Sequence, residues 1–288
     1  MFRPGELETL MESIRRYGVQ VPISVFKEGR RYVLIDGERR WRCSVKLNRP
    51  AIPALIQEKP NALTNLLLMF NIHALREQWD LLTIALKLPR VIELLTKNGR
   101  QPTERELSAE TGLARGLLRR CRLLMDLPSK YRDGLLDELN KPKSQQKLTE
   151  DFFIEMERAL TTVIRALPSV IEDKDRVRDV LISKYKAGTI KNITDFRNLA
   201  KIARAENVSV DSATASVVIA KVFQKNDYSV EQAYEDSVSE AYSERELLTR
   251  IEGLVEKLDD LVPESMDDAL RGALSQLLNR LSAILRQR

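Results

Sequence analysis

Two short stretches of the sequence combine arginines with patterns that suit phosphate. The first consists of Gly37, Glu38, Arg39, Arg40 and Arg42. A strand, a tight turn and a helix start at this point would direct backbone N–H groups and the positive end of a helix dipole at one spot. Arginine adds charge and forked donors that match phosphate oxygens. The pattern predicts an anion site, and a solvated helix start is the alternative.

The second stretch has the layout of a helix-turn-helix. Thr103 and Glu106 form a capping-box pattern at the start of a first helix, Gly112 lies in the turn, and a second helix follows. Leucines fall on one side of this second helix. Basic residues gather on roughly the opposite side: Arg115, Arg119, Arg120 and Arg122.

A basic face opposite an apolar face is what a recognition helix in the major groove requires. Arginine can clamp phosphates or the O6/N7 edge of guanine. Because no acid lies between Glu110 and Asp126, the four arginines would repel one another without a polyanion. We therefore expect these arginines to contact double-stranded DNA, and an ordinary solvated helix face is the alternative.

Composition sets limits on the class of protein. With 288 residues, 43% apolar and 31% charged, the chain fits one to three globular, helix-rich domains. Residues 1–147 carry 27 Lys and Arg against 17 Asp and Glu, whereas residues 148–288 carry 20 against 25. The basic front half indicates a polyanion partner, and the acidic rear half argues against nucleic acid along the whole chain.

The cysteine count and the hydropathy indicate where the protein works. Two cysteines, Cys43 and Cys121, lie in helical patterns, which argues against a disulfide framework or a zinc site and fits a reducing cytoplasm. No run is long enough to span a bilayer, and no signal peptide precedes Phe2. We expect a cytoplasmic, nucleoid-associated protein without a membrane partner. The start directly before the first helix also suggests that an N-terminal segment is missing.

Hydrophobic periodicity predicts the elements that position the first cluster. A helix is expected at residues 6–17 and another at 38–47, with strands at 21–26, 31–35 and 51–56. Together they form a compact α+β unit. Trp41 is expected to pack the second helix on the sheet rather than to stack on a base.

Further helices complete the prediction. They are expected at residues 61–75 and at 80–97, where Pro89 should kink or split the helix. Beyond a polar linker at 141–147 the chain looks entirely helical. A row of basic residues there is expected to form a charged helix face, and the alternative is that it extends the DNA-binding surface: Lys174, Arg176, Arg178, Lys184 and Lys186.

Leucines step by four and three through the last 46 residues, on both sides of Pro263. This spacing predicts a hairpin of two helices with one continuous apolar stripe. It favours pairing of the stripe with a second copy, hence a homodimer. Packing within one chain is the alternative.

The segment from Leu7 to Leu55 contains an amphipathic helix, a glycine stop at Gly18, Pro22 opening a strand, and the Gly37 turn. In order, spacing and residue type it resembles the N-terminal domain of the ParB family of chromosome and plasmid partition proteins. The run Leu-Leu-Met-Asp-Leu-Pro extends the resemblance more loosely to about residue 130. Proteins of that family bind a centromere-like DNA site, and many bind CTP, which closes them into a sliding clamp.

The resemblance implies a fold and a site. The fold is an α+β N-terminal domain of ParB/sulfiredoxin-like type, followed by an all-α helix-turn-helix and a helical C-terminal region. The nucleotide, CTP or a similar one, would bind to Gly18, Gln20, Pro22, Gly37, Glu38, Arg39, Arg40, Arg42 and Asn71. A partition ATPase is a further implied partner.

One segment departs from the family pattern. Where the family has Glu-Asn-aliphatic-Gln-Arg, which contributes to the triphosphate and its magnesium, this chain has Phe70, Asn71, Ile72, His73 and Ala74. An aromatic ring cannot ligate a hard cation, which prefers oxygen. Magnesium binding is therefore in doubt, and whether the chain is a slow CTPase stays open. His73 lacks a second ligand at metal spacing, so a structural role is favoured.

These observations predict four segments: a nucleotide-binding domain at 1–60, a helix-turn-helix domain at 61–147, a helical domain at 148–242 and the hairpin at 243–288. The leading hypothesis is a dimeric, sequence-specific DNA-binding protein of the partition type, in segregation or a derived transcriptional role. One alternative is a nucleotide-independent DNA-binding regulator. Another is a ParB-like nuclease or phosphotransferase, for which Asp36 and Glu38 could serve phosphoryl chemistry.

Overall fold

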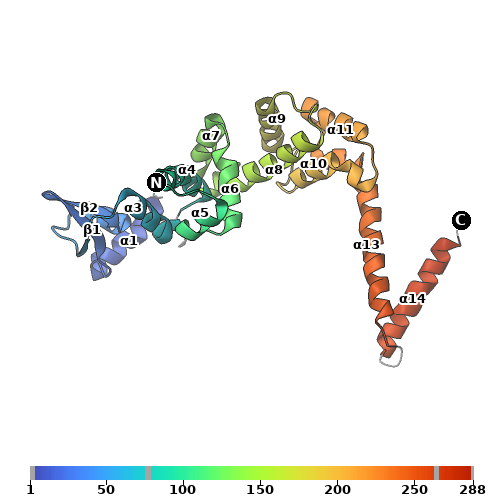
Figure 1. The fold of residues 1–288 in the computed structure, drawn as a ribbon, viewed down its shortest axis with the longest axis horizontal. Helices are drawn as coiled ribbons and strands as arrows, with labels where there is room; N and C mark the ends of the chain where they lie inside the picture. Colours follow the sequence, from blue (N-terminus) through green and yellow to red (C-terminus); the bar gives the residue numbers. More distant parts are fainter. Residues whose placement is uncertain (1–3, 75–78, 263–265, 287–288) are drawn as a thin grey trace. The chain divides into compact units, whose positions relative to one another are not determined.

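The computed structural model describes residues 4–74, 79–262 and 266–286 (Figure 1). Contacts divide the chain into two compact units, Met1–Thr161 and Thr162–Arg288. None of the described helices has the length and apolarity needed to cross a bilayer. The predicted fold class, an α+β domain followed by helices, is confirmed.

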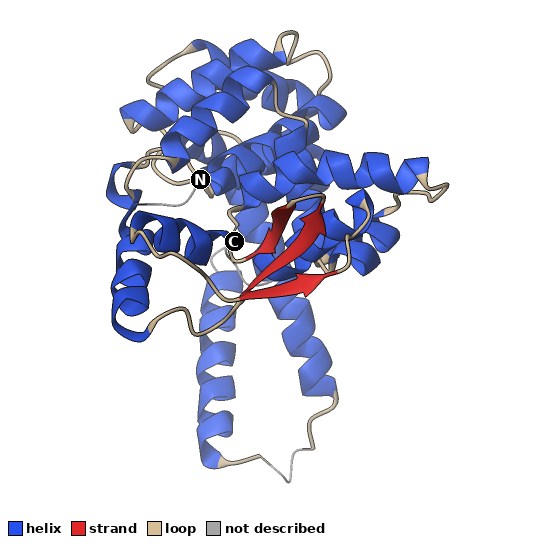
Figure 2. Cartoon of the chain, turned by 90° about the vertical axis from the view of Figure 1, so that its left-hand side faces the viewer, coloured by secondary structure: helices blue, strands red, loops and turns tan. Residues whose placement is uncertain are grey.

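The N-terminal domain is a small sheet with helices packed against it (Figure 2). In chain order it contains α1 (Pro4–Tyr17), β1 (Ile23–Glu28), β2 (Arg31–Asp36), α2 (Glu38–Lys46) and β3 (Ala54–Gln57). The strand order is β2-β1-β3, with β1 antiparallel to β2 and parallel to β3. All three predicted strands are present, although β1 and β3 begin two or three residues later than expected.

A small apolar core joins α1 to α2. Leu7 and Ile14 from α1 pack against Cys43 from α2, whose side chain is fully buried. Gly18 ends α1 by adopting a φ of 76°, and its N–H donates to the carbonyl of Ile14. This packing fixes the position of α2, which carries the first arginine cluster.

Helices make up the rest of the first unit. They are α3 (Ala62–Met69), the π-helical turn Phe70–Ala74, α4 (Leu81–Lys97), α5 (Glu104–Thr111), α6 (Arg115–Met125), α7 (Ser129–Leu139), the short turn Lys143–Gln145, and the first part of α8 (Glu150–Ala166), within which the first unit ends. Pro89 lies inside α4, which continues past it as one helix. Of the two predicted effects of this proline, the split is therefore wrong.

The second unit contains a bundle of short helices. They are α9 (Lys174–Ala187), α10 (Asp195–Ala203), the turn Ala205–Val208, α11 (Ser212–Gln224) and α12 (Val230–Glu235). Lys184 is only 2% exposed, and its Nζ donates to the carbonyls of Lys225 and Tyr228 at 2.6 Å each. Arg178 is 5% exposed and pairs with Asp175. These two cations belong to the interior, so the hypothesis that they extend a DNA surface is wrong.

The chain ends in two helices, α13 (Ser239–Asp259) and α14 (Asp268–Leu285). No residue in either of these two described helices is buried. At the two ends of the predicted stripe, Leu247 is 60% exposed and Ile284 is 66% exposed. Packing within one chain therefore leaves the predicted apolar stripe largely uncovered. Pro263 lies outside the described residues.

Candidate functional site

The turn before α2 depends on glycine. Gly37 has a φ of 98°, and a Cβ built on it would lie 2.6 Å from Cγ2 of Ile23. Both facts disfavour a larger residue, because side chains rarely adopt this backbone conformation and Ile23 is buried in the sheet. No described side chain caps the N-terminus of α2. Its first N–H groups are thus available for an anion, as the sequence predicts.

Arg40 has a different environment from the one expected. Its Nη1 donates to the carbonyl oxygens of Val21 and Pro22, both at 2.6 Å, and its Nη2 lies 3.1 Å from Oδ2 of Asp36. These contacts tie α2 to the start of β1 and the end of β2. Arg40 therefore works as a structural clamp, and only its remaining hydrogens could contact a phosphate.

The other members of the first cluster lie around this clamp. Arg42 is exposed and forms an ion pair of 2.5 Å with Glu38 one turn earlier. Arg39 is half-buried on the same helix. Gln20 is exposed and donates to the carbonyl of Tyr17. The structure thus brings Pro22 to Arg40, while Arg42 and Gln20 remain accessible to solvent.

The segment that departs from the family pattern is partly core. Phe70 is fully buried and contacts Trp79 edge to face, with ring centroids 5.4 Å apart. Asn71 is exposed, and its Nδ2 donates to the carbonyl of Leu67 at 3.1 Å. Phe70 offers no oxygen to magnesium, and the described residues contain no cluster of His, Cys, Asp and Glu that could hold a metal. The side chain of His73 lies outside the described part of the chain.

An apolar hollow lies on one face of the sheet. Its volume is about 750 Å³, and its lining consists of Ile23, Val25, Tyr32, Val33, Leu34, Trp41, Ile52, Ala54 and Ile56. Trp41 is 45% exposed there. Trp41 thus lies on the side of α2 that faces the sheet, as expected, but it lines an open hollow and is not buried in a core.

The second arginine cluster is built on a compact helix, turn and helix. Thr103 Oγ1 accepts a hydrogen bond from the N–H of Glu106 at the start of α5. Gly112 ends α5 with a φ of 74°. Leu118, Cys121 and Leu124 are fully buried on one side of α6. The opposite side of α6 faces solvent, as the spacing predicts.

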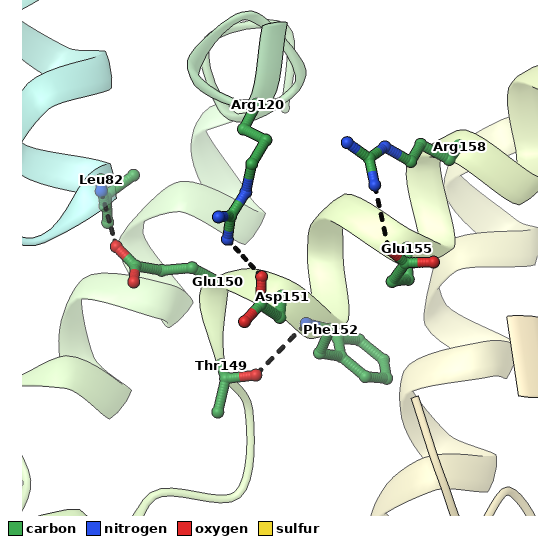
Figure 3. A network of polar contacts seen from close by, with 8 residues as sticks. All are labelled: Leu82, Arg120, Thr149, Glu150, Asp151, Phe152, Glu155 and Arg158. Atoms are coloured by element: carbon green, nitrogen blue, oxygen red, sulfur yellow. Dashed lines mark hydrogen bonds and ion pairs between the residues drawn. The ribbon is translucent and has the colours of Figure 1, made fainter. Parts of the chain in front are cut away.

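The four arginines of α6 are not equivalent. Arg115 and Arg122 are exposed and form no ion pair with any residue that the structure describes. Arg119 pairs with Glu104 of α5, and Arg120 pairs with Asp151 of α8 (Figure 3). The expectation that these arginines lack acidic neighbours is therefore wrong, because the acids come from other helices. Arg119 nevertheless keeps a side-chain exposure of 66%.

The start of α8 holds a network of polar contacts (Figure 3). Glu150 Oε1 accepts the N–H of Leu82, in the first turn of α4, at 2.6 Å. Burial is the main cause that raises the pKa of Glu150 above its usual value. Thr149 caps α8 by accepting the N–H of Phe152. This network joins α4, α6 and α8, and a Thr-Glu-Asp start is its only sequence signal.

Known proteins of one kind are similar to this chain in sequence. A probable chromosome-partitioning protein ParB of Helicobacter pylori is 29% identical over 184 residues, 64% of this chain and 61% of that protein. One of Pseudomonas putida is 41% identical over 90 residues, 31% of this chain and 30% of that protein. The chain thus spans less than two thirds of the length of either relative.

A solved structure is also similar. It is the C-terminally truncated chromosome-partitioning protein ParB of Caulobacter crescentus complexed to the centromeric parS site, with a TM-score of 0.38 and 21% identity over 57% of this chain and 82% of that one. The family model described as the ParB N-terminal domain matches residues 1–72. This match confirms the resemblance of the N-terminal segment to the ParB family.

Proposed function

We propose that this protein binds a specific double-stranded DNA site through α6 and acts in chromosome or plasmid segregation, or in a derived transcriptional role. The observation that carries the proposal is the exposed row of Arg115, Arg119 and Arg122 opposite the buried face of α6. Such a row can contact phosphates and guanine edges of a major groove. The relatives named as probable chromosome-partitioning proteins support the same interpretation.

The test is selection of bound fragments from a pool of random duplex DNA. We expect the full chain to enrich one motif, palindromic if two copies bind together. The double variant Arg115→Ala, Arg122→Ala should bind all duplexes more weakly and with a shallower salt dependence, because two phosphate-neutralising charges are lost. A pool that shows no enrichment with the unaltered protein contradicts the proposal.

A nucleotide is the second part of the proposal. The uncapped start of α2 and the tight turn at Gly37 support an anion there, and the ParB resemblance points to a triphosphate such as CTP. Occupancy would change how the N-terminal domains of two copies meet, to the extent that the two arrangements bind the nucleotide with different affinity. Equilibrium binding of labelled CTP, with and without magnesium, tests this part. Because Phe70 supplies no oxygen, we expect little dependence of binding on magnesium.

A nucleotide-independent DNA-binding regulator is the second candidate. Two observations favour it: Arg40 directs its guanidinium to the protein's own carbonyls, and Phe70 is core. CTP at millimolar concentration that neither binds nor alters DNA affinity would select this candidate. A partition ATPase as partner belongs to the first candidate alone.

A homodimer through α13 and α14 completes the proposal. The two helices expose a stripe of leucines, none of which is buried by the residues that the structure describes. Within its helical span, α13 carries six acids and three cations, whereas α14 carries one acid and two cations. Opposite net charges on the two helices favour packing of α13 from one copy on α14 of another.

A further inference from the structure

Glu104 and Arg119 meet through one edge of the guanidinium. Arg119 Nε lies 2.7 Å from Oε1 of Glu104, and Nη2 lies 3.4 Å from Oε2. The carboxylate belongs to the first residue of α5, and the arginine to the middle of the exposed side of α6. The Glu104 side chain is 26% exposed and that of Arg119 66% exposed. In this ion pair the carboxylate is half-buried, whereas the guanidinium is exposed to solvent.

This arrangement leaves a defined set of donors on Arg119. The side-on contact uses the Nε hydrogen and one Nη2 hydrogen. The second Nη2 hydrogen and both Nη1 hydrogens remain, and no other described residue accepts from Arg119. The Nη1 and Nη2 hydrogens at the far end form a second fork, which matches the paired O6 and N7 acceptors of guanine.

We propose that Glu104 is a positioning residue for sequence reading: it holds Arg119 so that its outer fork contacts one guanine of the DNA site. The inference rests on the proposed DNA-binding function of α6. A long arginine side chain loses rotamer freedom when it binds, and a carboxylate that already restricts it reduces that loss. We therefore expect Glu104 to affect the preference for one base more than the overall affinity for DNA.

The competing interpretation is that Glu104 only neutralises Arg119. Phosphate attraction depends on net charge, so removal of a merely neutralising acid should tighten binding to every duplex alike. Removal of a positioning acid should instead reduce the preference for one base, while binding to unrelated DNA stays equal or becomes tighter. The two interpretations predict different changes in the ratio of two affinities, and this ratio is measurable.

The chain offers a closely matched control. Glu110 also lies on α5, its side chain is 28% exposed, and it pairs with Arg100, which lies outside α6. Glu104→Gln and Glu110→Gln therefore remove the same charge from the same helix at similar exposure. Only the first touches an arginine of α6.

The experiment uses the full chain and the duplex selected by the unaltered protein. Fluorescence anisotropy measures its affinity, the affinity for duplexes in which single guanines are replaced by adenine, and that for a scrambled duplex. We expect Glu104→Gln to lower discrimination at one guanine roughly two- to fivefold, the range of an exposed ion pair. Arg119→Ala should lower it at the same position roughly tenfold or more. Glu110→Gln should leave it unchanged.

Two further variants guard against indirect effects. Arg119→Lys keeps the charge without the fork, so it should lose discrimination at that guanine and keep the salt dependence. The double variant Glu104→Gln, Arg119→Ala should discriminate no worse than Arg119→Ala alone, because the acid acts only through the arginine. Thermal unfolding should show that both Glu104→Gln and Glu110→Gln are fully folded at the temperature of the binding assay.

Two results would overturn the inference in different ways. If Glu104→Gln tightens binding to all duplexes equally and keeps the guanine preference, Glu104 is a neutralising acid and the DNA-binding function stands. If the unaltered protein selects no motif, the proposed function of α6 fails, and the inference fails with it.

Discussion

Arg40 Nη1 lies 2.6 Å from the carbonyl oxygen of Pro22, at the point where the chain enters the sheet. The same atom contacts the carbonyl of Val21, and Nη2 reaches Asp36 at the end of β2. One guanidinium therefore joins α2, the entry to β1 and the exit of β2. These contacts hold the segments on both sides of the turn at Gly37 together.

Arg40→Ala should destabilise the N-terminal domain. The variant loses hydrogen bonds from a charged donor to a half-buried carbonyl, which corresponds to about 2 kcal/mol of unfolding free energy. Arg42→Ala is the control, because its ion pair with Glu38 is exposed and contributes about 0.5 kcal/mol or less. Denaturation by urea measures both. Equal effects of the two substitutions would contradict the structural role of Arg40.

Gly37→Ala should be more damaging than the same change at another glycine with positive φ. At Gly37 the new methyl would lie 2.6 Å from Ile23 Cγ2, in addition to the backbone strain of about 1–2 kcal/mol. Gly18 has a φ of 76°, and no atom outside its immediate chain neighbours lies within 4 Å of where its Cβ would be, so Gly18→Ala reports the strain alone. Urea denaturation should place Gly37→Ala below Gly18→Ala in stability. A smaller loss at Gly37 would mean that Ile23 moves aside without penalty.

Local patterns predicted most of the fold. The three strands and the helices around them follow from β-branched runs, glycine stops and leucine spacing, which act between residues close in sequence. The turn at Gly37 and the row of arginines on α6 were found in the same way. These features depend on chain geometry alone, so one sequence is enough to predict them.

Most of the errors at the candidate site concern contacts between residues distant in sequence. Arg119 meets Glu104 fifteen positions away, and Arg120 meets Asp151 thirty-one positions away. No helical period joins such pairs, so their neighbours could not be derived. The exposure of Trp41 could not be predicted for a related reason. Spacing shows on which face of a helix a residue lies, whereas the exposure of that face depends on what packs against it.

Glu150 should make the first unit less stable as the pH rises. Its pKa is raised in the folded protein, mainly by burial, so the folded state binds its proton more tightly than the unfolded state. The contribution of this group is fully present below the usual glutamate pKa and is lost as the pH rises through the elevated value. Glu150→Gln keeps an acceptor for the N–H of Leu82 and lacks the proton.

We therefore expect the stability difference between Glu150→Gln and the unaltered protein to shift in favour of the variant between mildly acidic and neutral pH. Chemical denaturation at a series of pH values measures this. Glu150→Ala, which also leaves the Leu82 N–H without its acceptor, should be less stable than Glu150→Gln by about 1 kcal/mol at every pH. A pH-independent difference for Glu150→Gln would show that the carboxylate stays ionised at no penalty.

Leu254→Asp should convert a dimer into monomers. Leu254 belongs to the stripe of α13 that also contains Ile251 and Leu258, and a carboxylate there would be buried in the proposed interface of both copies. The dimer dissociation constant should rise by a factor of about ten or more, because each interface receives two such charges. Thr249→Asp adds the same charge to an exposed position of α13 away from the stripe and should leave the dimer intact. Light scattering after size exclusion, over a range of protein concentrations, distinguishes these outcomes. An unaltered protein that is monomeric at every concentration would exclude this interface, because the proposed dimer forms by burying the leucine stripe.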